Sequence, residues 1–309
     1  MEIAVDAVGI CGTDVGIYRG KIPVSYPRVL GHEVVGRTLA AVEDGPPMGT
    51  RVIVDPNVSC GRCARCLEGR QNLCPFGGLL GRDLDGALGP VLSAPVTNLH
   101  LLPETVADHL APLIQVLTTC VHGHRLVEIF PGDAVVVLGL GVTGLLHLQL
   151  AKMRGADPVI GVTRDESRLR LARELGASVT IPAGEAAVVA EVREATGGGA
   201  VVVIESAGTV ATLGRAVEMI RPGGRVLAYG TIAEPDGAFP FYELYYKEAA
   251  IVGTRAATAE DFPVAMWAVA SGAVRLDPLI GERITLGEVG DALASGRTSG
   301  LKTVVELRG

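Results

Sequence analysis

Positive charge is scarce in this sequence and is nowhere concentrated. The chain carries 27 Lys and Arg against 34 Asp and Glu, which gives a formal net charge of −7. The only lysines are Lys21, Lys152, Lys247 and Lys302, and no run of basic residues occurs. Proteins that bind a nucleic-acid backbone need clustered Lys and Arg to neutralise its phosphates. The composition therefore argues against a nucleic-acid partner.

Signals for export and membrane insertion are also missing. Met1-Glu2-Ile3 leads directly into a strand pattern, without the basic start and small-residue cleavage site of a signal peptide. One uncharged run, residues 134–151, is 18 residues long and approaches the length of a membrane-spanning helix. Its glycines and the interior His147 and Gln149 favour a strand, a turn and a helix instead. We expect a cytoplasmic protein with no membrane partner.

Aromatic residues are few, at 4% of the chain, whereas hydrophobic residues reach 48% and consist largely of Val, Ala and Leu. Such a composition suits parallel strands that are buried on both faces. A chain of 309 residues is long enough for two domains, each with a sizeable core.

A glycine-rich turn follows one predicted buried strand, residues 135–138. Gly139, Gly141 and Gly144 supply the pattern G-x-G-x-x-G, with Val142 and Thr143 inside it, before a predicted helix. Glycines at this spacing let the backbone approach a pyrophosphate, whose charge the free N–H groups of the helix start can bind. Glycine is common here (41 of 309), so the motif alone is weak. Its position between strand and helix predicts a dinucleotide site rather than a plain turn.

From about residue 128, predicted strands alternate with predicted helices, which is typical of a doubly wound parallel sheet and an α/β fold. The predicted strands after the glycine turn are 158–163, 200–205, 225–229 and 251–254, and the helices are 166–175 and 211–220. The second helix is predicted to stop at Arg221-Pro222-Gly223-Gly224.

A lobe near residues 58–76 holds four cysteines in the spacing C-x2-C-x2-C-x7-C: Cys60, Cys63, Cys66 and Cys74. Disulfides are improbable in a cytosolic chain, and this spacing suits thiolates that converge on one tetrahedral zinc. Four protein ligands leave no open position, which predicts a structural zinc. A redox C-x-x-C pair and an iron–sulfur cluster are the alternatives.

Together with Cys11-Gly12-Thr13-Asp14, Gly31-His32-Glu33 and Ser299-Gly300-Leu301-Lys302, these stretches resemble the zinc-dependent alcohol dehydrogenases of the medium-chain dehydrogenase/reductase family. The resemblance runs through nearly the whole chain. It implies a GroES-like β-barrel catalytic domain, residues 1–118 and 258–309, interrupted by a Rossmann nucleotide-binding domain, residues 119–257. It also implies a homodimer or homotetramer.

The resemblance places Cys11, His32 and Glu33 where that family holds its catalytic zinc. A thiolate, an imidazole and a carboxylate suit zinc, and an open position would accept substrate. Asp14 is expected to orient the His32 imidazole. Thr13 lies where the family's hydroxyl hydrogen-bonds the alcohol and begins its proton relay.

Three features depart from the family's usual pattern. Gln115 occupies a further zinc-side position that is commonly Cys, Glu or Asp, and an amide oxygen is a poorer ligand. We therefore expect a weakly held catalytic zinc. Gly16 replaces a His that passes the alcohol proton to solvent in many relatives. The segment before Cys11 is shorter by roughly one hairpin, so that either the start codon is misassigned or the barrel is trimmed.

The choice of cofactor depends on the end of the second predicted strand. An acidic residue there would bind the ribose 2′-OH of NAD. Here Thr163 leaves room for a 2′-phosphate and Arg164 offers a guanidinium to bind it, so NADP is favoured over NAD. Asp165 adjoins and weakens this argument. We expect Thr119, Ser206, Gly230 and Thr231 to lie near the cofactor, although turn chemistry alone also explains such small residues.

We therefore expect an enzyme that transfers a hydride between an alcohol and NAD(P), with zinc as a Lewis acid. The partner is a small alcohol or carbonyl compound, and a polyol, sugar or secondary alcohol is suggested by the resemblance. A zinc-free quinone or enone reductase is the second interpretation, and a nucleotide-binding relative without turnover is the third.

Overall fold

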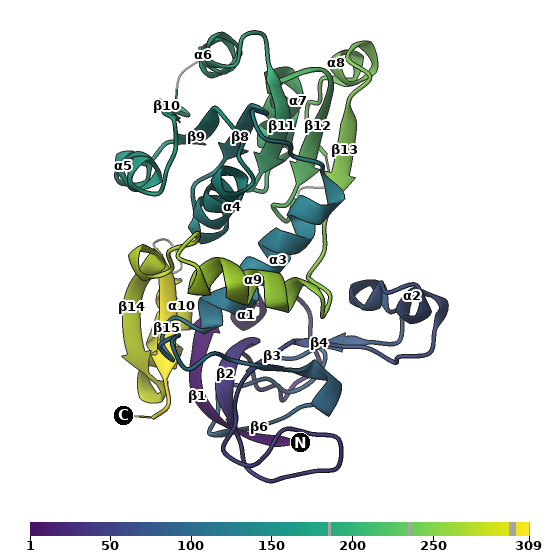
Figure 1. Ribbon diagram of the computed structural model, residues 1–309, viewed down its shortest axis with the longest axis vertical. Coiled ribbons are helices and arrows are strands. Elements are labelled where there is room, and N and C mark those ends of the chain that lie inside the picture. The colour runs from purple at the N-terminus through teal and green to yellow at the C-terminus, as the bar shows by residue number, and fades with distance from the viewer. Residues whose placement is uncertain (185–186, 234–235, 297–300, 309) are drawn as a thin grey trace. The chain divides into compact units, whose positions relative to one another are not determined.

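The computed structural model describes residues 1–184, 187–233, 236–296 and 301–308. Within that range the chain forms two compact units (Figure 1). Unit 1 comprises residues 1–119, 256–272 and 276–309, and unit 2 comprises residues 120–255 and 273–275. Of the predicted family motif near the C-terminus, Ser299 and Gly300 lie outside the described residues.

Unit 1 is built on a mixed sheet in the order β14-β15-β1-β2-β3-β7, with β6 also paired to β1. Apolar residues of β1, β2, β3 and β15 are fully buried, among them Ile3, Val34, Val52 and Val305. The strands are β1 (Glu2–Ile10), β2 (Glu33–Thr38), β3 (Arg51–Val54), β6 (Val91–Ser93), β7 (Leu99–Leu101), β14 (Ile280–Thr285) and β15 (Lys302–Glu306).

Strand β1 brings the two ends of the chain together. It pairs antiparallel with β2 on one side, in a register that sets Gly9 opposite Glu33. On the other side it pairs antiparallel with β15, with Ile10 opposite Thr303, so that the purple and yellow strands lie side by side in Figure 1. Cys11 directly follows β1, and His32 and Glu33 lie where β2 starts. The pairing of β1 with β2 therefore brings these three residues close together.

Helices and a small lobe complete unit 1. The lobe contains the two-stranded sheet of β4 (Asn57–Val58) and β5 (Gly78–Leu79) and the short helix α2 (Ala64–Leu67). The other helices are α1 (Gly12–Tyr18), the first part of α3 (Pro112–Leu126), α9 (Asp261–Ala270) and α10 (Val289–Ser295).

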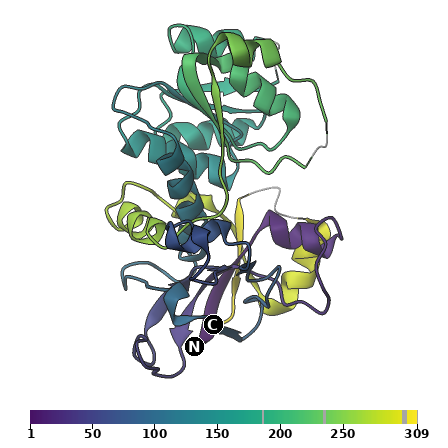
Figure 2. The same ribbon diagram turned by 90° about the vertical axis from the view of Figure 1, so that its right-hand side faces the viewer.

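Unit 2 is a parallel sheet in the order β10-β9-β8-β11-β12-β13, with helices packed on both faces (Figure 2). This is the predicted doubly wound α/β fold. The strands are β8 (Val135–Leu138), β9 (Val159–Thr163), β10 (Val179–Pro182), β11 (Ala200–Glu205), β12 (Ile220–Ala228) and β13 (Ala250–Gly253). The helices are α4 (Val142–Met153), α5 (Glu166–Glu174), α6 (Val188–Ala195), α7 (Val210–Met219) and α8 (Phe241–Tyr246).

One strand begins earlier than the sequence pattern indicates. The predicted turn at residues 221–224 is part of β12, because Ile220 already pairs with Ala200 before the register shifts to Arg225 opposite Val202. Gly223 has a φ of +72°, which accommodates this irregularity. The Pro-Gly-Gly segment is therefore a bulge within a strand.

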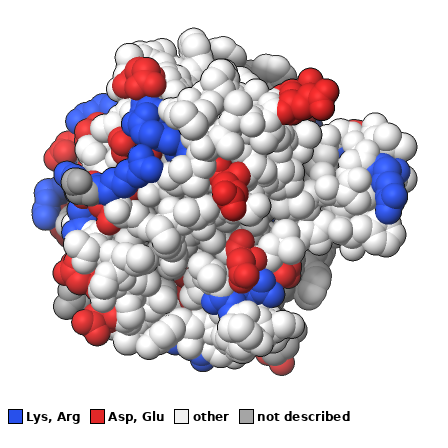
Figure 3. Space-filling view, turned by 90° about the horizontal axis from the view of Figure 1, so that it is seen from below, with Lys and Arg blue, Asp and Glu red and all other residues white. Residues whose placement is uncertain are grey.

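The uncharged run at residues 134–151 folds as β8, the glycine turn and most of α4. Among the described residues, no helix combines the length and apolar character needed to cross a membrane. On the face of the molecule drawn in Figure 3, Lys and Arg side chains are interspersed with Asp and Glu.

Candidate active site and metal centres

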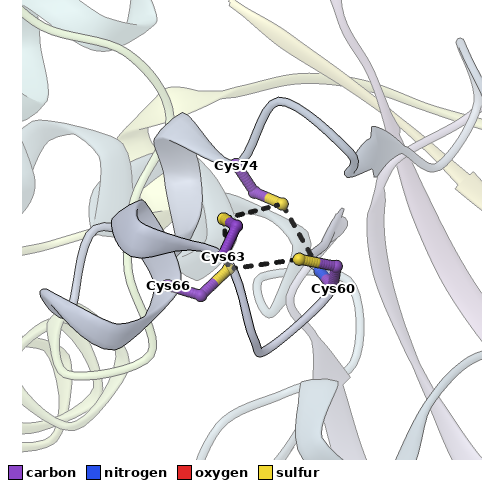
Figure 4. A group of neighbouring side chains, drawn as sticks. All are labelled: Cys60, Cys63, Cys66 and Cys74. Atoms are coloured by element: carbon purple, nitrogen blue, oxygen red, sulfur yellow. Dashed lines mark hydrogen bonds between the residues drawn. The ribbon is translucent and has the colours of Figure 1, made fainter.

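The four cysteines of the small lobe converge (Figure 4). The Sγ atom of Cys63 lies 3.5 Å from that of Cys66 and 3.8 Å from that of Cys74, and the Sγ atoms of Cys60 and Cys66 are 4.0 Å apart. Four sulfurs bound to one tetrahedral zinc at about 2.3 Å would be separated by roughly 3.8 Å. The cysteine arrangement therefore fits a single zinc ion.

The electrostatics of these thiols also suit a metal. The backbone N–H of Arg62 contributes most to lowering the pKa of Cys60 to about 6, so this residue is largely a thiolate at neutral pH. The pKa of Cys63 is raised to about 11, because burial and the neighbouring thiols outweigh a hydrogen bond from the backbone N–H of Cys66. A bound cation would favour the thiolate form of the neighbouring cysteines as well.

A second group of metal-binding side chains lies in unit 1. One ligand atom from each of Cys11, His32 and Glu33 lies within 4.8 Å of the others. Cys11 is the N-cap of α1, whereas His32 precedes β2 and Glu33 begins it. His32 and Glu33 are buried and Cys11 is half-buried, so a metal held here would be shielded from bulk water. Sulfur, nitrogen and carboxylate ligands together favour zinc among common biological metals.

Asp14 holds the loop that carries His32. Its Oδ1 accepts a hydrogen bond from the N–H of Gly31 at 3.0 Å, and its Oδ2 accepts one from the N–H of Cys11 at 2.8 Å. The same Oδ1 lies 3.6 Å from Nδ1 of His32. Burial opposes charge on both groups, but their mutual attraction lowers the pKa of Asp14 and raises that of His32. Asp14 therefore links the two ligand segments, and its position leaves Nε2 of His32 for the metal.

Thr13 and Gly9 flank the metal-binding residues. The hydroxyl oxygen of Thr13 lies 3.8 Å from Sγ of Cys11. Gly9 faces Glu33 across the sheet, and a Cβ atom at position 9 would overlap Oε2 of Glu33. Glycine at this position therefore provides the space that the Glu33 carboxylate occupies.

Lys302 is a functional residue to which the sequence interpretation gave no role. Its ammonium group lies 2.7 Å from each oxygen of Glu33 and donates to the carbonyl oxygen of Ile10 at 3.1 Å. Burial alone would lower the pKa of Lys302, but Glu33 and Cys11 outweigh burial and raise it. The carboxylate of Glu33 is thus compensated by a fixed cation before any metal binds.

Gln115 and Gly16, two of the residues that depart from the family pattern, both lie in unit 1. Gln115 is buried in the part of α3 that belongs to unit 1. At Gly16, an added Cβ atom would lie 2.8 Å from Cδ1 of Ile22, which fills the space next to α1. A histidine at position 16 would require Ile22 to move.

In unit 2 the glycine turn lies between β8 and α4. Gly139 has a φ of +95°, and a Cβ atom there would lie 2.9 Å from the backbone nitrogen of Ala207. A Cβ atom at Gly144 would overlap the carbonyl oxygen of Gly139. Gly141 is the N-cap of α4, and no atom lies within 4 Å of its Cβ position, so a phosphate has open access to the helix start.

The residues of unit 2 that are expected near the cofactor gather at the same edge of the sheet. The hydroxyls of Thr143 and Ser206 are 2.8 Å apart. A Cβ atom at Gly208 would lie 3.0 Å from the carbonyl oxygen of Thr231, and one at Gly230 would lie 2.5 Å from the backbone nitrogen of Gly208. Thr119 ends the first segment of unit 1, where its hydroxyl donates to the carbonyl oxygen of Val116 at 2.6 Å.

Glu205, at the end of β11, organises this edge and was not singled out from the sequence. Its fully buried Oε1 accepts hydrogen bonds of 2.8 Å from the N–H groups of Ala207 and Gly208 and from the hydroxyl of Thr212. Its carbonyl oxygen accepts from the N–H groups of Tyr229 and Gly230. The only available signal in the sequence was an acidic residue that ends an otherwise apolar strand.

The residues that would select the cofactor lie at the end of β9. Thr163 is half-buried and Arg164 is exposed. Asp165 caps α5, where its Oδ1 accepts from the N–H groups of Ser167 and Arg168. Because the Asp165 carboxylate is engaged with its own helix, it competes less with a phosphate for Arg164.

Comparison with known proteins identifies relatives over nearly the whole chain. Residues 1–104 match the alcohol dehydrogenase GroES-like domain, and residues 142–271 match the zinc-binding dehydrogenase family. A sorbitol dehydrogenase from Halalkalibacterium halodurans is 33% identical over 93% of this chain and 85% of that protein.

Two solved structures are similar in fold. One is a Sinorhizobium meliloti protein described as a zinc-binding dehydrogenase and bound to NADP, with 33% identity, a TM-score of 0.91 and coverage of 99% and 92% of the two chains. The other is an alcohol dehydrogenase from Escherichia coli in complex with NADH, with 30% identity, a TM-score of 0.91 and coverage of 99% and 91%.

Proposed function

The chain belongs to the zinc-type alcohol dehydrogenases of the medium-chain dehydrogenase/reductase family, and we propose that it oxidises a polyol with NADP as hydride acceptor and zinc as Lewis acid. The observation that supports the metal is the convergence of Cys11, His32 and Glu33 in unit 1. The second zinc is assigned to Cys60, Cys63, Cys66 and Cys74, where it would have a structural role.

When bound, zinc lowers the pKa of an alcohol hydroxyl, and the nicotinamide accepts the hydride. Cys11, His32 and Glu33 hold the metal and leave a position for the alcohol. Asp14 keeps the His32 ring oriented, which preserves the ligand geometry. Thr13 accepts the hydroxyl proton and passes it on. Because Gly16 cannot transfer a proton, water completes the relay.

The dinucleotide is assigned to the edge of the sheet in unit 2. The free N–H groups at the start of α4 bind the pyrophosphate, and Ser206, Gly230 and Thr231 line the path of the cofactor. Arg164 binds the 2′-phosphate, because Thr163 supplies no carboxylate for the 2′-OH of NAD. Sorbitol is the substrate named for one relative, which supports a polyhydroxylated alcohol as the substrate here.

The test is a panel of polyols, sugars and secondary alcohols assayed with NADP and with NAD, before and after zinc removal. We expect zinc-dependent reduction of NADP by at least one polyol. Turnover that is unaffected by zinc removal, with a quinone or enone as the better substrate, would favour the zinc-free reductase. Bound cofactor without any turnover would favour a non-enzymatic nucleotide-binding protein.

A further inference from the structure

A surface pocket of about 470 Å³ lies in unit 1 beside the loop that leads to His32. Two segments line it, one between α1 and β2 and one that follows β5. Its lining, here called the Arg28 pocket, consists of Pro23, Val24, Ser25, Arg28, Arg82 and Asp83. Neither the metal centres nor the dinucleotide edge uses these residues.

Arg28 has unused hydrogen-bonding capacity in this pocket. Its side chain is only 15% exposed, and its Nη1 donates to Oδ1 of Asp85 at 3.1 Å. The Nε atom is buried and has no acceptor among the described residues. A guanidinium has five N–H donors, and a buried donor without an acceptor is costly. The Nη2 atom of Arg28 also has no acceptor among the described residues and, unlike Nε, is not buried, so it can donate to a group bound in the pocket.

Arg82 provides a second guanidinium in the pocket, and one of its nitrogen atoms has no acceptor among the described residues. Its Nε and Nη2 donate to the Asp83 carboxylate at distances of 2.8 to 3.2 Å, which leaves Nη1 for another acceptor. Asp83 also accepts the N–H of Leu79 at 2.9 Å, so its carboxylate is already engaged. Asp85, the partner of Arg28, is 67% exposed, so solvent screens its charge more than that of Arg28.

The pocket is connected to the metal-binding residues through the backbone. Arg28 is four residues before His32. On the other side, a Cβ atom at Gly81, the neighbour of Arg82, would lie 2.9 Å from backbone atoms of Gly31. Gly31 is the residue that donates its N–H to Asp14. Both walls of the pocket therefore adjoin the segment that positions His32.

We propose that the Arg28 pocket binds an anionic group, a phosphate or a carboxylate, at the end of the polyol substrate that is distant from the reacting carbon. Two guanidinium groups with open donors are the arrangement that binds such oxyanions. Ser25 contributes a hydroxyl donor. This inference rests on the proposed polyol dehydrogenase activity and narrows its substrate to an acidic or phosphorylated polyol.

The test compares a neutral hexitol, the hexitol 1-phosphate and the matching aldonate as substrates of the holoenzyme. The variants are Arg28→Gln and Arg82→Gln, and the second keeps the test valid if the more buried Arg28 is needed for folding. Arg283→Gln is the control, because Arg283 forms an exposed ion pair with Glu306 in the same unit.

We expect a higher kcat/KM for an anionic substrate than for the hexitol, and the better of the two anions identifies the group. Each pocket variant should lower kcat/KM for that anion about tenfold, the loss of one charged hydrogen bond, and leave the hexitol unchanged. The control should change neither value. Equal values for all three substrates, unaffected by the variants, would overturn the anion site and leave the dehydrogenase activity standing.

If no alcohol is oxidised, the proposed function fails and the pocket is tested separately. Isothermal titration of the zinc-loaded protein with inorganic phosphate should then detect binding that Arg82→Gln weakens about tenfold. Absence of binding, or binding unchanged by the substitution, would overturn the anion site as well.

Discussion

The ammonium group of Lys302 lies 2.7 Å from the carboxylate of Glu33, although 269 residues separate the two in the chain. Both side chains are buried, Glu33 at 2% and Lys302 at 7% exposure. The pair joins β15 to the residue that begins β2, next to Cys11 and His32. It holds the Glu33 carboxylate in a defined position.

Replacing Lys302 by Met is expected to destabilise unit 1. The substitution keeps the length of the side chain but leaves a buried carboxylate unpaired, which typically costs about 3–5 kcal/mol. Urea denaturation of the metal-free wild type and of metal-free Lys302→Met measures the difference in the free energy of unfolding. The double variant Glu33→Gln/Lys302→Met should recover most of the loss, because no charge remains buried. A single variant as stable as the wild type would contradict this role for the pair.

Asp55 should make unit 1 less stable as the pH rises. Burial, with Asp261 nearby, raises the pKa of Asp55 from 3.8 to about 6, against hydrogen bonds from Asn57. The stability this group contributes is therefore fully present below pH 3.8 and is lost as the pH rises through 6. Asp55→Asn removes the titrating group and should be more stable than the wild type by on the order of 2–3 kcal/mol at pH 8.

Urea denaturation at pH 8 and near pH 3.5 measures the effect of Asp55→Asn, and the difference should disappear at the lower pH. Asp44→Asn, at an exposed position in the same unit, is the control and should alter neither value. A gain in stability that persists at low pH would refute titration of Asp55 as its cause.

Arg164→Ala should raise the KM for NADP about tenfold or more and leave the KM for NAD unchanged. The lost guanidinium would contact the 2′-phosphate, which NAD lacks, and one charged hydrogen bond corresponds to roughly a tenfold change. Initial rates with both cofactors give the ratio. Arg170→Ala, at an exposed position on α5, is the matched control. An unchanged NADP/NAD ratio in Arg164→Ala would remove Arg164 from the cofactor site.

Glu205→Ala should weaken both the fold of unit 2 and its affinity for the dinucleotide. Three donors lose their acceptor, two of them backbone N–H groups at the cofactor edge. At about 1 kcal/mol for each hydrogen bond, the free energy of unfolding should fall by about 3 kcal/mol. Glu205→Gln keeps an oxygen at this position and should restore most of the stability and the KM for the cofactor. Equal losses in both variants would show that the negative charge, rather than the acceptor, is needed.

Features set by local sequence were predictable. The apolar strand β8, the glycine turn and α4 follow from short-range patterns, because a change in hydrophobic period and a G-x-G-x-x-G turn are visible within 20 residues. The tight cysteine spacing likewise limits how the thiols of Cys60, Cys63 and Cys66 can be arranged. For Cys11, His32 and Glu33, separate in the chain, only a family resemblance suggested that they meet.

Features that depend on pairing between distant segments were not predictable. Nothing near Lys302 indicates that β15 pairs with β1 and brings the lysine to Glu33. The same holds for Glu205, whose role depends on how β11 and β12 end at one edge of the sheet. The early start of β12 at Ile220 is another case, because the pairing with Ala200 overrides the local preference of Pro-Gly-Gly for a turn. Tertiary contacts decide such positions.

Alcohol oxidation by this protein should require a zinc held by Cys11, His32 and Glu33. The most direct test of this requirement is stepwise removal of metal with a chelator, with zinc per chain and polyol-dependent NADP reduction measured together, in the wild type and in Cys11→Ser. In the wild type, the first zinc to leave should abolish turnover while the second remains on the cysteine lobe, and one equivalent of zinc should restore it. Cys11→Ser should retain the lobe zinc and have no turnover. Full activity of Cys11→Ser, or of the metal-free wild type, would show that a zinc at Cys11, His32 and Glu33 is not required for alcohol oxidation.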